Sequence, residues 1–311
     1  MKIIILGAAA GGGFPQWNCN CSVCATARRD PELAKPRTQS SLAISVDGKH
    51  WFLMNASPDL RQQISENRPL WPHTSERRGS GISGVILTNG DVDHICGLVN
   101  LRESQRLNLY ATRRILESLA ANKVFDVLNP DFVGRHQIVL NQTFEPVNPD
   151  GTLCGLTITP FAVPGKVALY LEDTSAGDNN FGSQAEDTIG LKISSSDTGT
   201  CFYYVPGCAK MSVELADRLR DASLVFFDGT LWEDTEMIEA GVGIKTGQRM
   251  GHMSMSGESG TLAAFATLNV DRKIFVHINN TNPVLLEKSN PRFEAEAAGW
   301  EIGYDGMEIS L

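Results

Sequence analysis

The order of short apolar segments along the chain is the feature that most constrains its fold. Runs rich in branched apolar residues, bounded by Gly, Asp or Pro, predict strands in two sets, and helical segments accompany each set. The predicted strands are 2–6, 41–46, 50–55, 84–88, 137–140, 156–161, 167–171, 188–193, 201–205, 224–227 and 273–277, with a last pair near the C-terminus. The predicted helices are 58–65, 113–124, 212–220, 259–268 and 291–298. This duplicated order favours an α/β fold in which two sheets pack together with helices outside.

The composition indicates a globular chain with an acidic surface. Of 311 residues, 42% are apolar and 20% are charged, which suits a sizeable core and argues against intrinsic disorder. No seam divides the chain, so we expect one domain over residues 1–311. The net charge of −9 argues against nonspecific binding to nucleic acid or to an anionic membrane surface. The apolar run at 3–6 is short for a signal peptide or a membrane span, and a buried first strand is the better interpretation.

Seven cysteines, three of them crowded together, indicate metal binding rather than a disulfide framework. An odd number cannot pair fully within one chain, and free thiols favour a reducing compartment, so we expect a cytoplasmic protein. Cys19, Cys21 and Cys24 follow a C-x-C-x-x-C spacing that can direct three thiolates at one ion. Structural zinc takes four N or S ligands in a tetrahedron. His252 is the leading candidate for the fourth ligand, and ordinary buried thiols are the alternative.

Several predicted strands end in aspartate or histidine followed by a polar loop. Asp91, Asp93 and His94 follow one strand closely, and carboxylates next to an imidazole can converge on a cation. A solvated acidic turn is the alternative for these three residues. Asp228 and His277 end two later strands in the same way, although a lone histidine at a strand end is more often structural. An active site assembled at one edge of the sheets would produce this pattern.

The stretch from Thr88 to Leu98, T-N-G-D-V-D-H-I-C-G-L, resembles a modified metallo-β-lactamase motif, T-H-x-H-x-D-H-x-x-G. The C-x-C-x-x-C knuckle and the ending at 303–308 resemble the phosphodiesterase branch of that superfamily. Together with the segments 55–59 and 277–283, nearly the whole chain is similar to the family of pyrroloquinoline quinone (PQQ) biosynthesis B proteins. The resemblance implies an αββα sandwich of two packed mixed sheets with flanking helices, and an active site at one edge.

Carried over position by position, the resemblance implies two separate metal sites. The structural zinc ligands of the phosphodiesterase relatives match Cys19, Cys21, Cys24 and His252. Ligands of the second catalytic metal site match Asp93, His94 and His277. The two leading histidines of the motif are Asn89 and Asp91 here, and the later histidine and bridging aspartate fall near 163–165 and Pro206. The first catalytic metal site has therefore lost most of its ligands, which argues against a two-zinc hydrolase.

The remaining ligands suggest different chemistry. Two histidines and one carboxylate with open positions suit non-haem Fe(II), which uses those positions for O₂ and substrate. The resemblance implies an iron-dependent oxygenase that hydroxylates the tyrosine ring of a crosslinked Glu–Tyr precursor of PQQ. Asp91 is expected to be a further ligand or an orienting group, and Asp228 a polar group near the metal. Arg61, Asn279 and Asn280 are expected to bind the substrate, the arginine through substrate carboxylates.

A soluble carrier that retains or moves PQQ or its precursor is the alternative function, since the family is also linked to PQQ transport. Both functions involve a small-molecule or dipeptide-like ligand rather than nucleic acid or a membrane, and a homodimer is compatible with both. The polar, glycine-containing loops 66–81 and 173–186 are candidates for lids over the site.

Overall fold

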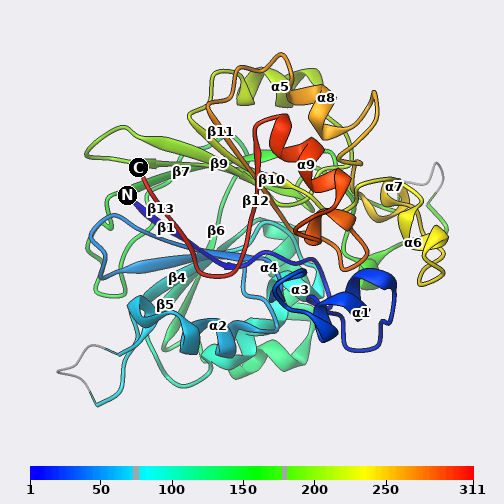
Figure 1. Cartoon of the computed structure of the whole chain (residues 1–311). Coiled ribbons are helices and arrows are strands. Elements are labelled where there is room, and N and C mark those ends of the chain that lie inside the picture. Colours follow the sequence, from blue (N-terminus) through cyan, green and yellow to red (C-terminus); the bar gives the residue numbers. More distant parts are fainter. Residues whose placement is uncertain (73–76, 177–180) are drawn as a thin grey trace.

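Two mixed sheets face each other in the computed structural model, which describes residues 1–72, 77–176 and 181–311 (Figure 1). The first sheet has the order β13 (Met307–Ser310), β1 (Lys2–Gly7), β2 (Ser41–Ser45), β3 (Trp51–Met54), β4 (Ile82–Ile86), β5 (Leu107–Ala111) and β6 (Val133–Gln137). The second has the order β12 (Trp300–Ile302), β11 (Arg272–Val276), β10 (Leu224–Asp228), β9 (Cys201–Val205), β8 (Ile189–Ser195) and β7 (Leu156–Ala162). The strands from β3 to β6 and from β9 to β12 run parallel to their neighbours, and the other pairs are antiparallel.

The alternation of side chains along each strand explains why both faces of each sheet are covered. In β1, Ile3 packs between the two sheets and Ile4 packs on the outer face of the first sheet. In β10, Phe226 packs between the sheets and Phe227 packs on the outer face of the second sheet. These strands are therefore apolar on both faces, and each outer face needs a layer of helices.

Helices supply those outer layers (Figure 1). The first sheet is covered by α2 (Leu60–Glu66) and α4 (Arg113–Ala121). The second sheet is covered by α5 (Val213–Leu219), α8 (Thr261–Phe265) and α9 (Asn290–Ala297). The predicted α/β fold of two packed mixed sheets with flanking helices is confirmed.

Shorter helices lie in the connections between these elements. The short α-helices are α1 (Ser22–Arg29), α3 (Val92–Ile95), α6 (Glu236–Glu239) and α7 (Gly247–Met250). The 3₁₀ turns are η1 (Arg68–Leu70), η2 (Cys96–Leu101), η3 (Lys123–Val127), η4 (Leu169–Leu171) and η5 (Pro283–Leu285). Within the described ranges, no helix combines the length and the apolar character that a bilayer crossing requires.

Several local predictions differ from the structure. The strand predicted at 167–171 is instead the single turn η4, whose Leu169 and Tyr170 side chains are exposed rather than buried in a sheet. The strand predicted at 137–140 lies earlier in the chain, as β6. It pairs with β5, a strand that the sequence pattern does not predict. The helix α1 also escapes prediction, because its N-terminal cap is the Cys21 thiol rather than a Ser, Thr or Asp.

The described fold does not test the predictions about lids, domain number, cellular location and oligomeric state. Residues 73–76 and 177–180, within the two candidate lids, lie outside the described residues. The lid function of those loops therefore stays a prediction. The single domain over 1–311, the cytoplasmic location and the homodimer also stay predictions.

Candidate metal centre

The carboxyl ends of the parallel strands place the candidate residues at one edge of both sheets. β4 leads into the loop that carries Asp91 and into α3, on which Asp93 and His94 lie. In the second sheet, β10 ends at Asp228 and β11 is followed by His277. Because the sheets face each other, these side chains meet, and all but the deeper Asp228 line one cavity of about 310 Å³. The strand-end pattern thus converges as the sequence predicts.

Asp93, His94 and His277 form one cluster at this edge. One donor atom from each residue lies within 4.8 Å of the others. Asp93 Oδ2 is 3.0 Å from His277 Nε2, and the rings of His94 and His277 stack with their centroids 5.3 Å apart. The three side chains expected to share a metal ion are therefore close enough to do so.

His94 gives the most direct indication that this cluster suits a cation. The residue is 2% exposed, and among the described residues neither ring nitrogen has a hydrogen-bond partner. Asp93 Oδ1 lies 3.4 Å from His94 Nδ1, outside hydrogen-bond geometry. Leaving a buried polar group unpaired costs roughly 1–3 kcal/mol. A metal ion shared with Asp93 and His277 would give the imidazole a ligand bond, so these residues fit the predicted group.

The backbone and one hydroxyl fix the orientation of His277. The residue has a φ of 57°, a left-handed conformation that is costly for a non-glycine residue and common at functional sites. Thr230 Oγ1 donates to Asp228 Oδ1 at 2.5 Å and lies 2.8 Å from His277 Nδ1. His277 Nδ1–H then donates to Thr230, which leaves the Nε2 lone pair facing the Asp93 carboxylate. A cation, either a metal ion or a second proton, makes that 3.0 Å approach favourable.

Asp228 is the buried charge that organises this network. Its carboxylate is fully buried and accepts hydrogen bonds from the amides of Cys208 and Thr230 and from the Thr230 hydroxyl. His252 Nδ1–H donates to the same carboxylate at 2.7 Å. A charge in the interior needs such partners, because an unpaired buried ion is strongly unfavourable. Asp228 therefore lies behind the cavity and positions Thr230 and His252.

The structure places His252 at the cavity and not at the cysteines. Its ring stacks on that of His277, with centroids 5.1 Å apart, and lines the cavity. Among the described residues, the metal-sized group of cysteines does not include His252. The prediction that His252 completes the structural zinc site is therefore wrong. The buried charge of Asp228 explains the difference, since it takes this imidazole as its ion-pair partner.

The carboxylates and imidazoles of the site stabilise each other's charges. Burial raises the pKa of Asp93, but His94 and His277 outweigh burial and hold that pKa well below its usual range. Burial also opposes ionisation of Asp228, and His252 outweighs it, so this pKa is lowered too. Burial lowers the pKa of His252, but Asp228 outweighs burial and raises it above its usual value. Both carboxylates are therefore anionic near neutral pH, as metal binding requires.

Asp91 lies at the start of α3, on the wall of the cavity. Its amide donates to Asn89 Oδ1 at 2.9 Å, and its Oδ1 accepts from the Leu169 amide at 3.1 Å. Burial, followed by the charge of Asp93, raises the pKa of Asp91. The described residues form three metal-sized groups: the three cysteines, Asp93 with His94 and His277, and Asp228 with His252 and His277. Asp91 belongs to none of them, so its role as a ligand or an orienting group stays a prediction.

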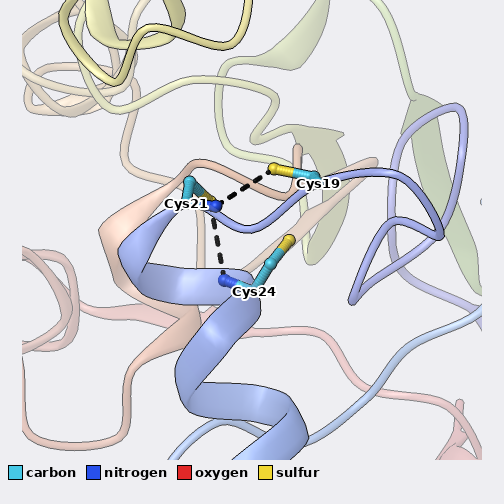
Figure 2. Close-up of side chains that lie close together, drawn as sticks. All are labelled: Cys19, Cys21 and Cys24. Atoms are coloured by element: carbon cyan, nitrogen blue, oxygen red, sulfur yellow. Dashed lines mark hydrogen bonds between the residues drawn. The ribbon is translucent and has the colours of Figure 1, made fainter.

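The three cysteines gather at the first turn of α1, and we call Cys19, Cys21 and Cys24 the cysteine clasp (Figure 2). Their sulfur atoms lie within 4.8 Å of one another. The Cys21 amide donates to Cys19 Sγ at 3.4 Å, and the Cys24 amide donates to Cys21 Sγ at 3.5 Å (Figure 2). Burial raises the pKa of Cys21 to about 12, so its thiolate form requires a strong cation such as zinc.

Asn280 lies against the cysteine clasp, so the prediction that it contacts substrate is wrong. Its main-chain oxygen is 3.8 Å from both Cys21 Sγ and Cys24 Sγ, and its side-chain Nδ2 is 3.3 Å from Cys24 Sγ. The residue is 4% exposed. Ligand atoms around a tetrahedral zinc lie about 3.3–3.8 Å apart, given bonds of about 2.0–2.3 Å. The oxygen of Asn280 therefore lies at about the spacing that a fourth ligand would have from two of the three sulfurs.

The other two predicted substrate residues lie in different places. Arg61 is exposed on α2 and is not among the described residues that line the cavity, so its predicted substrate contact stays a prediction without support from the cavity. Asn279 lines the cavity, and its Nδ2 donates to Thr281 Oγ1 at 2.7 Å. A substrate contact of Asn279 stays a prediction.

Thr230 and Lys166 are site residues that the sequence analysis does not single out. The signal for Thr230 is its place two residues after Asp228, at the end of a buried strand. Lys166 lines the cavity, but its sequence context does not mark it as a site residue. The apolar run after it resembles a strand, so the turn η4 is not predicted. The polar partners of the candidate ligands are thus harder to predict than the ligands.

Comparisons with known proteins find relatives along the whole chain. The family described as Beta-lactamase superfamily domain matches residues 50–278. The coenzyme PQQ synthesis protein B of Xanthomonas axonopodis pv. citri is 51% identical, and that of Methylobacterium nodulans is 52% identical, each over 100% of both chains. The chain belongs to the PQQ synthesis protein B family.

Solved structures agree with that assignment. The Zn(2+)-bound PqqB of Methylobacterium extorquens, 50% identical, covers 100% of both chains with a TM-score of 0.93. A diphosphatase from the PhnP family is 18% identical over 99% of this chain and 96% of its own, with a TM-score of 0.68, and shares the fold. This member of the PQQ synthesis protein B family therefore has the metallo-β-lactamase fold that its sequence resembles.

Proposed function

We propose that this chain acts in PQQ synthesis as an iron-dependent oxygenase that hydroxylates the tyrosine ring of a crosslinked Glu–Tyr precursor. The full-length relatives, named coenzyme PQQ synthesis protein B, support the role in PQQ synthesis. One observation supports the oxygenase step, namely the buried His94 ring beside Asp93 and His277, whose two nitrogens have no hydrogen-bond partner among the described residues. Two histidines and one carboxylate with open positions are the donor set of non-haem Fe(II) oxygenases.

Asp93, His94 and His277 would hold the ion, and the residues behind them would keep the ligands in place. A ferrous ion in this donor set supplies the activation of O₂. Thr230 orients the His277 ring through Nδ1, and Asp228 in turn orients Thr230. Such partners keep a ligating imidazole in one tautomer and one orientation.

His252 is placed to hold a proton beside the reacting ring. Its Nδ1–H donates to Asp228, so its Nε2 lies on the opposite side of an imidazole that lines the cavity. The charge of Asp228 stabilises the protonated ring. A positioned imidazolium of this kind can donate a proton to an oxygen of the substrate as a general acid.

The cavity suits a single substituted ring. Its volume of about 310 Å³ is at the small end of the range for ligand sites. Leu169, Met237 and Met250 supply apolar wall, while Lys166 and Lys245 supply positive charge. An aromatic ring that carries carboxylates matches this lining better than a neutral aliphatic ligand would.

We also propose that the cysteine clasp holds a structural zinc ion, with an oxygen of Asn280 as the fourth ligand. The support is the 3.8 Å spacing of the Asn280 oxygen from two sulfurs, and a solved family member that carries Zn(2+). The clasp would join the N-terminal loop to the turn after β11 and so contribute to folding energy.

Oxygen uptake by anaerobically reconstituted protein tests the oxygenase. Fe(II)-loaded protein should consume O₂ only when the crosslinked Glu–Tyr precursor is present, with hydroxylated product formed in step. His94→Ala should abolish both iron binding and uptake, while zinc at the clasp stays. His50→Ala is the matched control, because its ring is half-exposed and pairs with Asp47 on a surface turn.

The competing functions give different results in the same assay. Intact iron without O₂ uptake would contradict the oxygenase. Binding of PQQ without turnover or metal dependence would instead support a carrier. Equal turnover with zinc alone would support a hydrolase, against which the replacement of the motif histidines by Asn89 and Asp91 already argues.

A further inference from the structure

A second cavity, of about 640 Å³, opens beside the metal cavity and shares Lys166 and Gly251 with it. Lys210 and Arg249 also line this second cavity. Its lining is thus rich in positive charge, although the whole chain carries a net charge of −9. A concave surface of one sign concentrates ligands of the opposite sign. The second cavity therefore has the character of an anion site.

Glu172 holds two of these cations in fixed positions. Its carboxylate accepts from Lys166 Nζ at 2.9 Å and from the two terminal nitrogens of Arg249 at 3.0 and 2.7 Å. The Glu172 side chain is only 6% exposed. Lys210 is exposed and forms no ion pair with a carboxylate of the described residues. Among the described residues of this cavity and their ion-pair partners, three cations face one carboxylate, which leaves an excess of positive charge.

The surrounding backbone and one aromatic ring keep these cations in place. Gly251 has a φ of 87°, and a Cβ added there would lie 2.9 Å from Lys166 Cγ, so the lysine stem passes where only glycine leaves room. The Phe181 ring covers the Arg249 guanidinium at 3.8 Å. Cations that are fixed before a ligand arrives lose little conformational entropy on binding.

We propose that this second cavity binds a carboxylate of the same molecule whose aromatic ring enters the metal cavity. Lys166 lies at the boundary, lines both cavities and would contact the ligand from either side. Lys210 supplies an ammonium group that Glu172 does not occupy. The proposed ligand is an aromatic polycarboxylate. This proposal rests on the proposed function only for the identity of the ring that reacts.

Binding of PQQ, itself an aromatic polycarboxylate, tests this subsite on the full chain without requiring turnover. Isothermal titration calorimetry compares PQQ with its methyl ester, and the wild-type chain should bind PQQ more tightly. Lys210→Gln should weaken PQQ binding about twofold to fivefold, the usual effect of one exposed charge contact, and leave binding of the ester unchanged. Lys123→Gln is the matched control, because that side chain is 91% exposed and pairs with Asp126 on the surface.

The outcomes separate the subsite from the oxygenase. Equal affinities of the wild type and Lys210→Gln for PQQ would overturn the subsite, as would equal affinities for PQQ and its ester. Failure of the wild type to bind PQQ would overturn it as well. Any of these results is compatible with iron-dependent O₂ uptake, which tests the metal cavity. Failed uptake together with charge-dependent PQQ binding would overturn the oxygenase and leave the subsite intact.

Discussion

Thr230→Val isolates the hydroxyl that connects Asp228 to His277, with little change in side-chain volume. The hydroxyl donates to Asp228 Oδ1 at 2.5 Å, and it lies 2.8 Å from His277 Nδ1 and 3.1 Å from His252 Nδ1. Thr230 is 3% exposed, so water has little access to replace the lost contacts. The substitution therefore removes the support of one candidate ligand and leaves the ligand itself in place.

The size of the effect follows from the groups that lose a partner. Asp228 Oδ1 would keep only the amide of residue 230, and His277 Nδ1 would have no donor or acceptor opposite it. Asp228 Oδ1 keeps one partner, so His277 Nδ1 is the group left unpaired. An unpaired buried polar group costs roughly 1–3 kcal/mol, and the free energy of unfolding should fall by about that amount. Metal affinity should fall about 10- to 100-fold, the usual loss when the partner of a ligating histidine is removed.

Two measurements separate these effects. Urea unfolding of the metal-free chain gives the change in stability, and competition titration of Fe(II) gives the change in affinity. Thr159→Val is the matched control, since its hydroxyl faces Thr143 Oγ1 at 2.7 Å on the surface and should change stability by less than about 0.5 kcal/mol. Metal affinity in Thr230→Val equal to that of the wild type would refute the idea that Thr230 orients His277.

Three further predictions follow from single residues. Cys21→Ser should release the zinc of the cysteine clasp in elemental analysis, because a hydroxyl does not replace a thiolate ligand; zinc retained in full would contradict the clasp. Burial raises the pKa of Glu236 from 4.5 to about 7, so its contribution to stability is full below about pH 4.5 and is lost as the pH rises through about 7. Glu236→Gln should remove up to roughly 3 kcal/mol of this pH dependence in urea unfolding between about pH 4 and about pH 8, and an unaltered profile would contradict it. Gly97→Ala should lower stability by about 2 kcal/mol, because a Cβ there would collide with the Ser57 carbonyl oxygen, and an unchanged unfolding midpoint would contradict the geometry.

Continuity of the apolar runs decides which strands the sequence predicts. Strands such as 201–205 and 224–227 are buried on both faces, so nearly every residue is apolar and the pattern is plain. β5 escapes because Asn108 interrupts its run, and the amide of that side chain donates to the Val147 carbonyl at 2.9 Å. In the turn η4 the apolar run predicts a strand where there is none, because Leu169 is 55% exposed at the cavity rather than buried in a sheet. The hydrophobicity of a short segment does not show whether a distant part of the chain covers that segment.

The site shows a similar division between residue type and placement. The family resemblance, together with several strand ends that carry aspartate or histidine, predicts Asp93 and His277, although neither residue alone would be a clear signal. The sequence does not tell which of two metal centres His252 faces, because that choice depends on the buried charge of Asp228, 24 residues away. Asn279 and Asn280 are neighbours in one turn, yet one lines the cavity and the other lies at the cysteine clasp.

The site draws its groups from both sheets and from widely separated parts of the chain. The loop after β4 brings Asp93 and His94, the turn before η4 brings Lys166, and the ends of β10 and β11 bring Asp228 and His277. No proteolytic piece containing a single sheet would hold the complete donor set. Capture of iron would therefore report that the two halves have docked, and oxygen chemistry would be withheld from nascent or partly folded chains.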